Sequence, residues 1–132
     1  MLFRSQLLAE SDFVSIHSPL KAETRHQIGA RELALMKKSA FLFNTARGPI
    51  VDHSALTDAL YAGAIAGAAL DVTDPEPPVP DDPLLSAPNL IVVPHIGSAT
   101  RSARERMTEL AVDNLLAGLD GRPMPHQANA LP

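Results

Sequence analysis

The stretch AFLFNTARGPIVDHSALTDALYAGAIAGAALDV, residues 40–72, decides the fold. It opens on the almost wholly apolar run of residues 40–43, which predicts a strand. Asp52 is placed to cap a helix, and Gly63 is placed to end it. Residues 65–72 are small and apolar, and they predict the next strand. The order strand, helix, strand indicates an α/β fold with a parallel sheet.

The same alternation continues on both sides of this stretch. Residues 5–10 predict the end of a helix, 13–16 a strand, 30–38 a short amphipathic helix and 90–93 a fourth strand. The strands are continuously apolar instead of alternating in polarity, which favours a sheet that helices cover on both faces. The proline-rich segment between these last strands, residues 75–88, is expected to be a rigid loop on the same domain.

A last helix is predicted after the fourth strand. Ser98 or Thr100 can cap it, and Gly118 and Gly121 are placed to end it. Apolar residues keep helical spacing along it at Ala103, Met107, Leu110, Ala111 and Leu115.

Composition excludes several classes of protein. The 132 residues make one domain at most, or part of one. The 11 Lys and Arg against 15 Asp and Glu give a formal charge of −4, so nucleic acid is not an expected partner. The absence of Cys excludes a disulfide scaffold and a thiolate zinc site, and it fits a reducing cytoplasm. No apolar run is long enough to span a membrane, the first residues do not read as a signal peptide, and the histidines show no metal-ligand spacing. A cytoplasmic protein with no metal is expected.

Polar and ionisable residues follow every predicted strand, while the strand bodies carry almost none. They are residues 17–20 with Thr24, residues 44–48, Asp71 with Glu76, and residues 94–100. Because ligands bind beyond the carboxyl ends of the strands in α/β sheets, this edge is the expected site.

Three of these residues form a chemical set. Arg47 carries a planar cation that suits a carboxylate, and His95 can give and take a proton near neutral pH. Glu76 could pair with His95 and favour its protonated form. Taken singly, each is an ordinary loop residue, but each follows a different strand at the same edge. The set suits a 2-oxo acid, and a cofactor must then supply the hydride.

Four motifs carry a resemblance to a known family. VSIHSPL (14–20), NTARGPIVD (44–52), GAALDVTDPEP (67–77) and VVPHIGSAT (92–100) resemble the D-isomer-specific 2-hydroxyacid dehydrogenases, in order, over about residues 7–129. Within that family, DVTDPEP, HIGSAT and the tail NLLAGLDGRPMP are most similar to glyoxylate/hydroxypyruvate reductases.

The resemblance implies roles for individual residues. It implies that Arg47 binds the substrate, that His95 protonates its carbonyl and that Glu76 supports His95. It implies that Asp71 holds the nicotinamide carboxamide and that Arg47 and His95 also border the cofactor. The other cofactor-binding residues that it implies are Thr45 and Ala46 on the nicotinamide side, Ser18, Pro19 and Thr24 near the adenosine and ribose, and Ile96, Gly97 and Ser98 beside the nicotinamide.

The resemblance also implies a fold and an activity. The fold is a partial Rossmann-like, doubly wound parallel sheet, the C-terminal half of an NAD(P)-binding domain over residues 1–118, with a C-terminal tail over residues 119–132. No G-x-G-x-x-G phosphate loop follows any strand, so the sequence resembles only the C-terminal part of the enzyme. The implied activity is hydride transfer between NAD or NADP and a small 2-oxo or 2-hydroxy acid, by an enzyme that is a homodimer when complete.

A different class of function stays open. The chain could be a truncated, non-catalytic module that only pairs with a full-length partner, or, less in keeping with its residues, a relative of the dinucleotide-sensing corepressors of the family. For a partial sheet we also expect Phe13, Ile16, Phe41 and Phe43 to be less well covered than in a complete domain.

Overall fold

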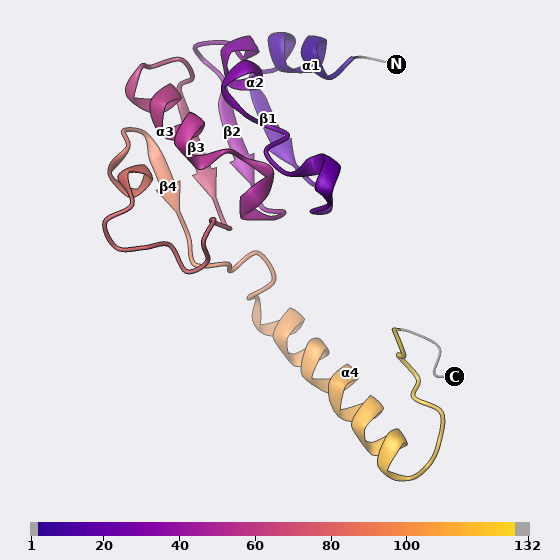
Figure 1. Cartoon of the computed structure of the whole chain (residues 1–132). Helices are drawn as coiled ribbons and strands as arrows, with labels where there is room; N and C mark the ends of the chain where they lie inside the picture. Colours follow the sequence, from indigo (N-terminus) through magenta and orange to yellow (C-terminus); the bar gives the residue numbers. More distant parts are fainter. Residues whose placement is uncertain (1–2, 129–132) are drawn as a thin grey trace. The chain divides into compact units, whose positions relative to one another are not determined.

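Four parallel strands form the sheet of this chain, whose computed structural model describes residues 3–128 (Figure 1). They lie side by side in sequence order: β1 (Phe13–Ile16), β2 (Phe41–Asn44), β3 (Gly67–Leu70) and β4 (Leu90–Val92). The register places Val14 opposite Leu42 and Leu42 opposite Ala68. An α/β fold with a parallel sheet is therefore confirmed, and all four carboxyl ends open on one edge.

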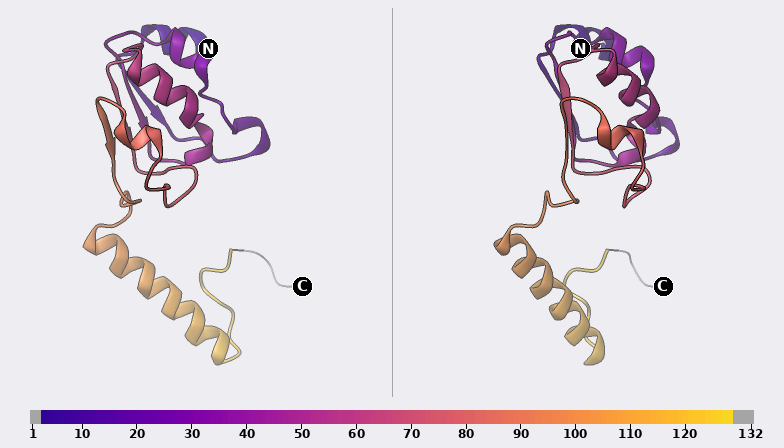
Figure 2. Two further views of the ribbon diagram at one scale, coloured as in Figure 1. Left: turned by 60° about the vertical axis from the view of Figure 1, so that its left-hand side comes forward. Right: turned by 90° about the vertical axis from the view of Figure 1, so that its left-hand side faces the viewer.

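Three helices pack on one face of this sheet. They are α1 (Arg4–Glu10), α2 (Ala30–Leu35) and α3 (His53–Tyr61), and both views of Figure 2 show α2 and α3 on the same side of the strands. Short 3-10 turns cover Ala22–Thr24, Gly48–Ile50 and Pro83–Ser86. The core between helices and sheet is apolar, and its most deeply buried side chains include Leu8, Leu33, Leu42, Ile50, Leu56, Leu70 and Leu84. Removing this surface from water stabilises the fold.

The first unit supplies helices to one face of the sheet only, and side chains on the opposite face are exposed among its described residues. Side chains alternate between faces along a strand, and burial alternates with them: Val14 is buried while Phe13 is 70% exposed. Ile91 is 64% exposed on β4. An apolar strand fits either situation, because its sequence does not say whether helices cover the second face.

Ile16 corrects one expectation. Phe13 and Phe41 are exposed as expected, at 70% and 39%, but Ile16 is buried. Ile16 lies three residues after Phe13 and therefore points to the other face, toward the helices.

The helix boundaries follow from local chemistry. Asp52 caps α3, because its Oδ1 accepts a hydrogen bond from the backbone N–H of Ala55 at 3.1 Å. Gly63 follows α3 with φ 60°, the left-handed conformation that ends a helix readily in glycine. The second helix ends at Leu35 and not at residue 38, because Met36 adopts an extended backbone and is itself buried.

The chain divides into two units, the first ending at His95 and the second starting at Ile96. The second unit holds α4 (Arg101–Leu119). Of the two predicted caps, Thr100 is the one used: its Oγ1 accepts from the N–H of Ala103 at 3.2 Å. Gly118 lies inside the last turn of the helix, whereas Gly121 lies just beyond it with φ 66°.

The apolar positions of α4 are largely exposed. Met107 is 59% and Leu115 61% exposed, and within the described residues of α4 only Ala117 is buried. None of the helices within residues 3–128 combines the length and the apolar character that crossing a membrane requires. The expected boundary between residues 118 and 119 stays a prediction.

Candidate active site

Two pockets open at the carboxyl edge of the sheet. One lies at the ends of β3 and β4 and has a volume of about 350 Å³. The other lies at the ends of β1 and β2 and has a volume of about 450 Å³. Between them they contain most of the residues that the sequence singled out, at the edge where it placed the site.

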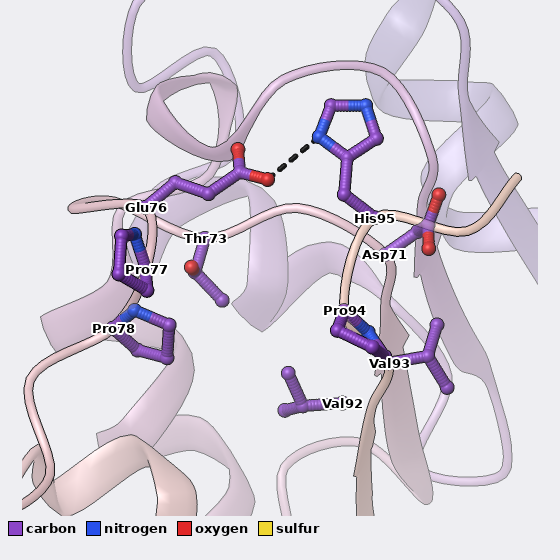
Figure 3. A pocket seen from close by; sticks show the side chains of 9 residues that line it. All are labelled: Asp71, Thr73, Glu76, Pro77, Pro78, Val92, Val93, Pro94 and His95. Carbon is purple, nitrogen blue, oxygen red and sulfur yellow. Dashed lines mark hydrogen bonds and ion pairs between the residues drawn. The ribbon is translucent and has the colours of Figure 1, made fainter.

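The pocket at β3 and β4 has apolar walls and polar groups at its rim (Figure 3). Pro77, Pro78 and Val92 line its apolar part. His95 comes from the segment after β4, and Glu76 comes from the loop after β3. Figure 3 shows their side chains pointing toward each other at the mouth of the pocket.

Glu76 and His95 are in direct contact. The Oε1 atom of Glu76 lies 2.6 Å from Nδ1 of His95, and the two side chains are 40% and 49% exposed. A carboxylate can only accept, so this contact assigns the Nδ1 proton to His95 and leaves Nε2 as the ring atom that can exchange a proton with a ligand. The backbone of His95 is in the left-handed region with φ 53°, a sparsely populated conformation for a residue other than glycine.

Loop geometry brings Glu76 to this position. Thr73 is buried, and its Oγ1 donates to the carbonyl of Pro75 at 2.8 Å. Asp74 forms an ion pair with Arg25 at 3.3 Å. The peptide bonds before Pro75 and Pro77 are both cis. The segment between β3 and Glu76 is thus held by a buried hydroxyl on one side and an ion pair on the other.

Asp71 lies at the same edge of the sheet. It follows β3 directly, it is only 7% exposed, and it lines the pocket together with Glu76 and His95. Its backbone N–H donates to the carbonyl of Asn44 at 2.9 Å, which continues the ladder between β2 and β3 by one step. Asp71, which is expected near the nicotinamide, therefore shares one pocket with the pair of Glu76 and His95.

The pocket at β1 and β2 gathers most of the remaining predicted residues. Its lining is His17, Ser18, Pro19, Leu20, Thr45, Ala46 and Arg47. Arg47 is exposed, and its Nη1 donates to the carbonyl of Ala46 at 2.7 Å. The planar cation therefore lines a cleft whose other walls are polar and apolar side chains.

The structure brings the predicted residues together in two groups. Glu76, His95 and Asp71 line one pocket and Arg47 lines the other, and no described residue belongs to both linings. Strands β2 and β4 are separated by β3, so the segments that follow them start roughly 10 Å apart. Such a separation suits a ligand that extends along the edge of the sheet.

Two groups of predicted residues lie elsewhere. Thr24 turns into its own loop, where its Oγ1 donates to the carbonyl of Pro19 at 2.8 Å and accepts from the N–H of Lys21 at 2.7 Å. Thr24 therefore shapes the loop that carries Ser18 and Pro19. Ile96, Gly97 and Ser98 open the second unit, and their role at the cofactor stays a prediction.

Sequence reasoning assigned no individual role to two polar side chains that line these pockets, although it placed His17 at the expected edge. His17 lines the cleft with Arg47, and its Nε2 lies 2.8 Å from Oγ of Ser15. Thr73 lines the pocket with Glu76. The signal for His17 was its place directly after a strand. Thr73 carried none, because its role depends on a bond to a backbone carbonyl two residues away.

Comparison with known proteins identifies the family. The pattern of the family described as "D-isomer specific 2-hydroxyacid dehydrogenase, NAD binding domain" matches residues 4–97. The glyoxylate reductase of Thermofilum pendens is 54% identical over 123 residues, which cover 93% of this chain and 36% of that protein. The glyoxylate/hydroxypyruvate reductase B of Pectobacterium carotovorum is 56% identical over 115 residues, which cover 87% of this chain and 36% of that protein.

Solved structures agree with this. The TT0316 protein of Thermus thermophilus matches with a TM-score of 0.90 and 52% identity, over 97% of this chain and 41% of that one. The D-lactate dehydrogenase of Lactobacillus jensenii, solved with NAD+, matches with a TM-score of 0.85 and 33% identity, over 96% of this chain and 42% of that one. The chain thus spans little more than a third of the length of the curated relatives it matches. It belongs to the D-isomer-specific 2-hydroxyacid dehydrogenase family, as part of the NAD-binding domain and close to the glyoxylate and hydroxypyruvate reductases.

Proposed function

We propose that the protein containing this chain reduces the C2 carbonyl of a small 2-oxo acid, glyoxylate or hydroxypyruvate, with NADH or NADPH, and catalyses the reverse reaction. The observation that carries the proposal is the 2.6 Å contact of Glu76 with His95 in a pocket that also contains Asp71. The names of the similar reductases support the choice of substrate.

The residues present fit a nicotinamide cofactor. The carboxylate of Asp71 would accept from the carboxamide N–H groups, and Thr45 and Ala46 in the neighbouring cleft would border the nicotinamide side of the cofactor. When bound, NADH or NADPH supplies the hydride. In this proposal Ser18, Pro19 and Thr24 form the loop on the adenosine side, and Ile96, Gly97 and Ser98 lie beside the nicotinamide.

The chain's own groups would bind the acid and move the proton. The guanidinium of Arg47 offers two parallel N–H donors to the substrate carboxylate. Nε2 of His95 donates a proton to the carbonyl oxygen, which becomes the hydroxyl of the product. Glu76 accepts the Nδ1–H of His95, fixes the orientation of the ring and stabilises its positive charge before transfer.

A chimera tests the proposal. This chain replaces the matching 123 residues of the Thermofilum pendens glyoxylate reductase, and oxidation of NADH and NADPH is followed with glyoxylate and with hydroxypyruvate. We expect turnover, and we expect His95→Asn to lower kcat by at least about a hundredfold because it removes the proton donor. His126→Asn, an exposed histidine of the second unit, is the matched control.

The exposed sheet face favours a second candidate. A chain that presents Phe13, Phe41 and Ile91 to solvent could act as a non-catalytic module that pairs with a full-length partner. A folded chimera that turns over neither glyoxylate nor hydroxypyruvate contradicts the reductase proposal and leaves the non-catalytic module as the remaining candidate. Mixing the chain with the complete relative and measuring the mass of the complex tests the pairing directly. We expect the complete reductase to be a homodimer.

A further inference from the structure

Asn44 is a buried amide among apolar side chains. It is the last residue of β2, it is fully buried, and its register partners on the neighbouring strands are Ile16 and Leu70. A buried amide costs free energy unless its polar atoms are hydrogen-bonded, so its bonds indicate why it is there.

The side chain of Asn44 binds the turn that follows it. Its Oδ1 accepts from the N–H of Ala46 at 3.1 Å, and its Nδ2 donates to the carbonyl of Arg47 at 2.9 Å. Its main-chain carbonyl accepts from the N–H of Asp71 at 2.9 Å. Asn44 thus holds the peptide group before Ala46 and the peptide group after Arg47, and it joins them to the strand end that carries Asp71.

The far side of the same turn is held by packing. A Cβ at Gly48 would collide with the backbone carbonyl of Thr73, so the chain directly after Arg47 lies against the loop that leads to Glu76. The backbone at Arg47 is therefore held on one side by the hydrogen bonds of the Asn44 amide and on the other by the close contact of Gly48 with Thr73. The long side chain of Arg47 is exposed, so the fold fixes the position of its Cα and not that of the whole side chain.

We propose that Asn44 is a positioning residue for Arg47, and that it sets where the guanidinium meets the substrate carboxylate. The inference rests on the proposed function, in which Arg47 binds that carboxylate. Bidentate pairing depends on the position and the plane of the guanidinium, so a displaced turn weakens it without removing the charge. Asn44 itself touches neither substrate nor cofactor in this proposal.

The first test is a double-mutant cycle in the chimera. Asn44→Ser keeps an oxygen that can accept from Ala46, but its single short hydroxyl removes the Nδ2 donor to Arg47 and cannot make both bonds at once. We expect it to lower kcat/KM for glyoxylate at least about tenfold, mainly through KM, because small displacements of a binding group are costly. In an Arg47→Ala background we expect a further change of less than about twofold, since the two residues then act as a unit. If the loss of kcat/KM in the double variant equals the product of the losses in the two single variants, the proposal is overturned.

Asn114 gives a matched control. Its amide makes the same pair of bonds, accepting from the N–H of His126 at 2.8 Å and donating to the carbonyl of His126 at 3.0 Å, but it lies in the second unit. Asn114→Ser should leave kcat/KM within about twofold of the parent. A loss as large as that of Asn44→Ser means that the effect is not specific to the turn at Arg47.

The second test needs no activity and uses the 132-residue chain itself. Hydrogen exchange at the Ala46 amide should be at least about tenfold faster in Asn44→Ala, because its acceptor is gone, while exchange in β1 stays within about twofold of the parent. Unchanged protection of Ala46 overturns the role of Asn44. If the parent chimera does not turn over, the proposed function fails, and this measurement still decides whether Asn44 holds the turn.

Discussion

At the scale of single residues, the pair of Glu76 and His95 depends on a contact between side chains that are nineteen positions apart in the chain. Both side chains are partly exposed, so water screens the pair and its contribution to folding stability is small. Its value lies in orientation. The carboxylate fixes which ring nitrogen of His95 carries the permanent proton, and it turns the other nitrogen outward to a ligand.

Replacing Glu76 tests that role. Glu76→Gln keeps the shape and an acceptor oxygen but removes the charge that stabilises the protonated ring. In the chimera we expect kcat to fall at least about tenfold and the solvent deuterium isotope effect on kcat to rise, because proton transfer becomes slower. Glu105→Gln on α4, which removes the partner of Arg101, should change neither quantity. An unchanged isotope effect with a normal kcat means that the pair does not serve proton transfer.

Arg47 offers a second test at this scale. Arg47→Lys keeps the charge but loses the planar fork, so it is not conservative if the residue binds a carboxylate. We expect kcat/KM for glyoxylate to fall at least about tenfold, roughly 1.4 kcal/mol of transition-state stabilisation. Steady-state kinetics of the chimera measures it, with Arg104→Lys on α4 as the control. Unchanged kinetics would remove Arg47 from the site.

At the scale of elements, α3 contains a half-buried titratable group whose ring nitrogens are shielded from solvent. His53 is the first residue of the helix, and neither ring nitrogen has a hydrogen-bond partner among the described residues. Burial lowers the pKa of His53 below its ordinary value of 6.5, although the carboxylates of Asp82, Asp74 and Asp52 oppose the shift and His26 adds to it. Asp82 lies next to the turn Pro83–Ser86, which packs against α3.

The sign of the resulting pH dependence follows from proton binding. The folded chain takes up the His53 proton only at a pH below 6.5, whereas the unfolded chain takes it up around 6.5. In that window the unfolded state binds more protons, so the free energy of unfolding falls as the pH is lowered. We expect lower urea midpoints at about pH 5.5 than at about pH 7.5, and a smaller difference in His53→Gln. His126→Gln in the second unit should keep the full difference. An equal difference in all three chains means that His53 is not its source.

Sequence patterns predicted the positions of the helices and strands better than the tertiary contacts around them. The apolar runs marked all four strands, and Asp52 and Gly63 marked the ends of α3, because these signals act over a few neighbouring residues. The end of α2 at Leu35 and the burial of Met36 were not predicted, because they depend on what the end of the helix packs against. The exposure of one sheet face and of apolar side chains on α4 likewise depends on tertiary contacts, which no local sequence pattern contains.

The site was predicted to a similar degree. The edge of the sheet and the pairing of Glu76 with His95 followed from the order of strands and from a familiar chemical set. That Arg47 lines a separate cleft follows from β3 lying between the strands that precede Arg47 and His95. The brace from Asn44 was not foreseen, because an asparagine at a strand end forms such bonds only when the turn after it closes back on its side chain.

At the scale of the whole molecule, the exposed apolar groups on the sheet decide how the chain behaves in solution. Phe13 stacks on Phe41 with ring centroids 6.1 Å apart and lies 6.2 Å from Phe43, so the exposed aromatic rings of β1 and β2 form one cluster. Ile91 adds an exposed aliphatic side chain on β4. Exposed apolar clusters favour association, and here the exposed side chains include residues of both edge strands, β1 and β4.

We therefore predict that the 132-residue chain, purified by itself, self-associates through this sheet face. Light scattering at concentrations of about 10–100 μM should show species larger than a monomer, because association driven by a few hundred Å² of apolar surface is appreciable in that range. The double variant Phe13→Gln/Ile91→Gln should shift the population toward monomer without lowering the urea midpoint, since both side chains are exposed. Met107→Gln, a similarly exposed apolar position on α4 at 59%, separates the sheet face from the helix as the source of association. A parent chain that stays monomeric across the range, or association that only Met107→Gln relieves, would show that the exposed aromatic cluster is not the adhesive surface.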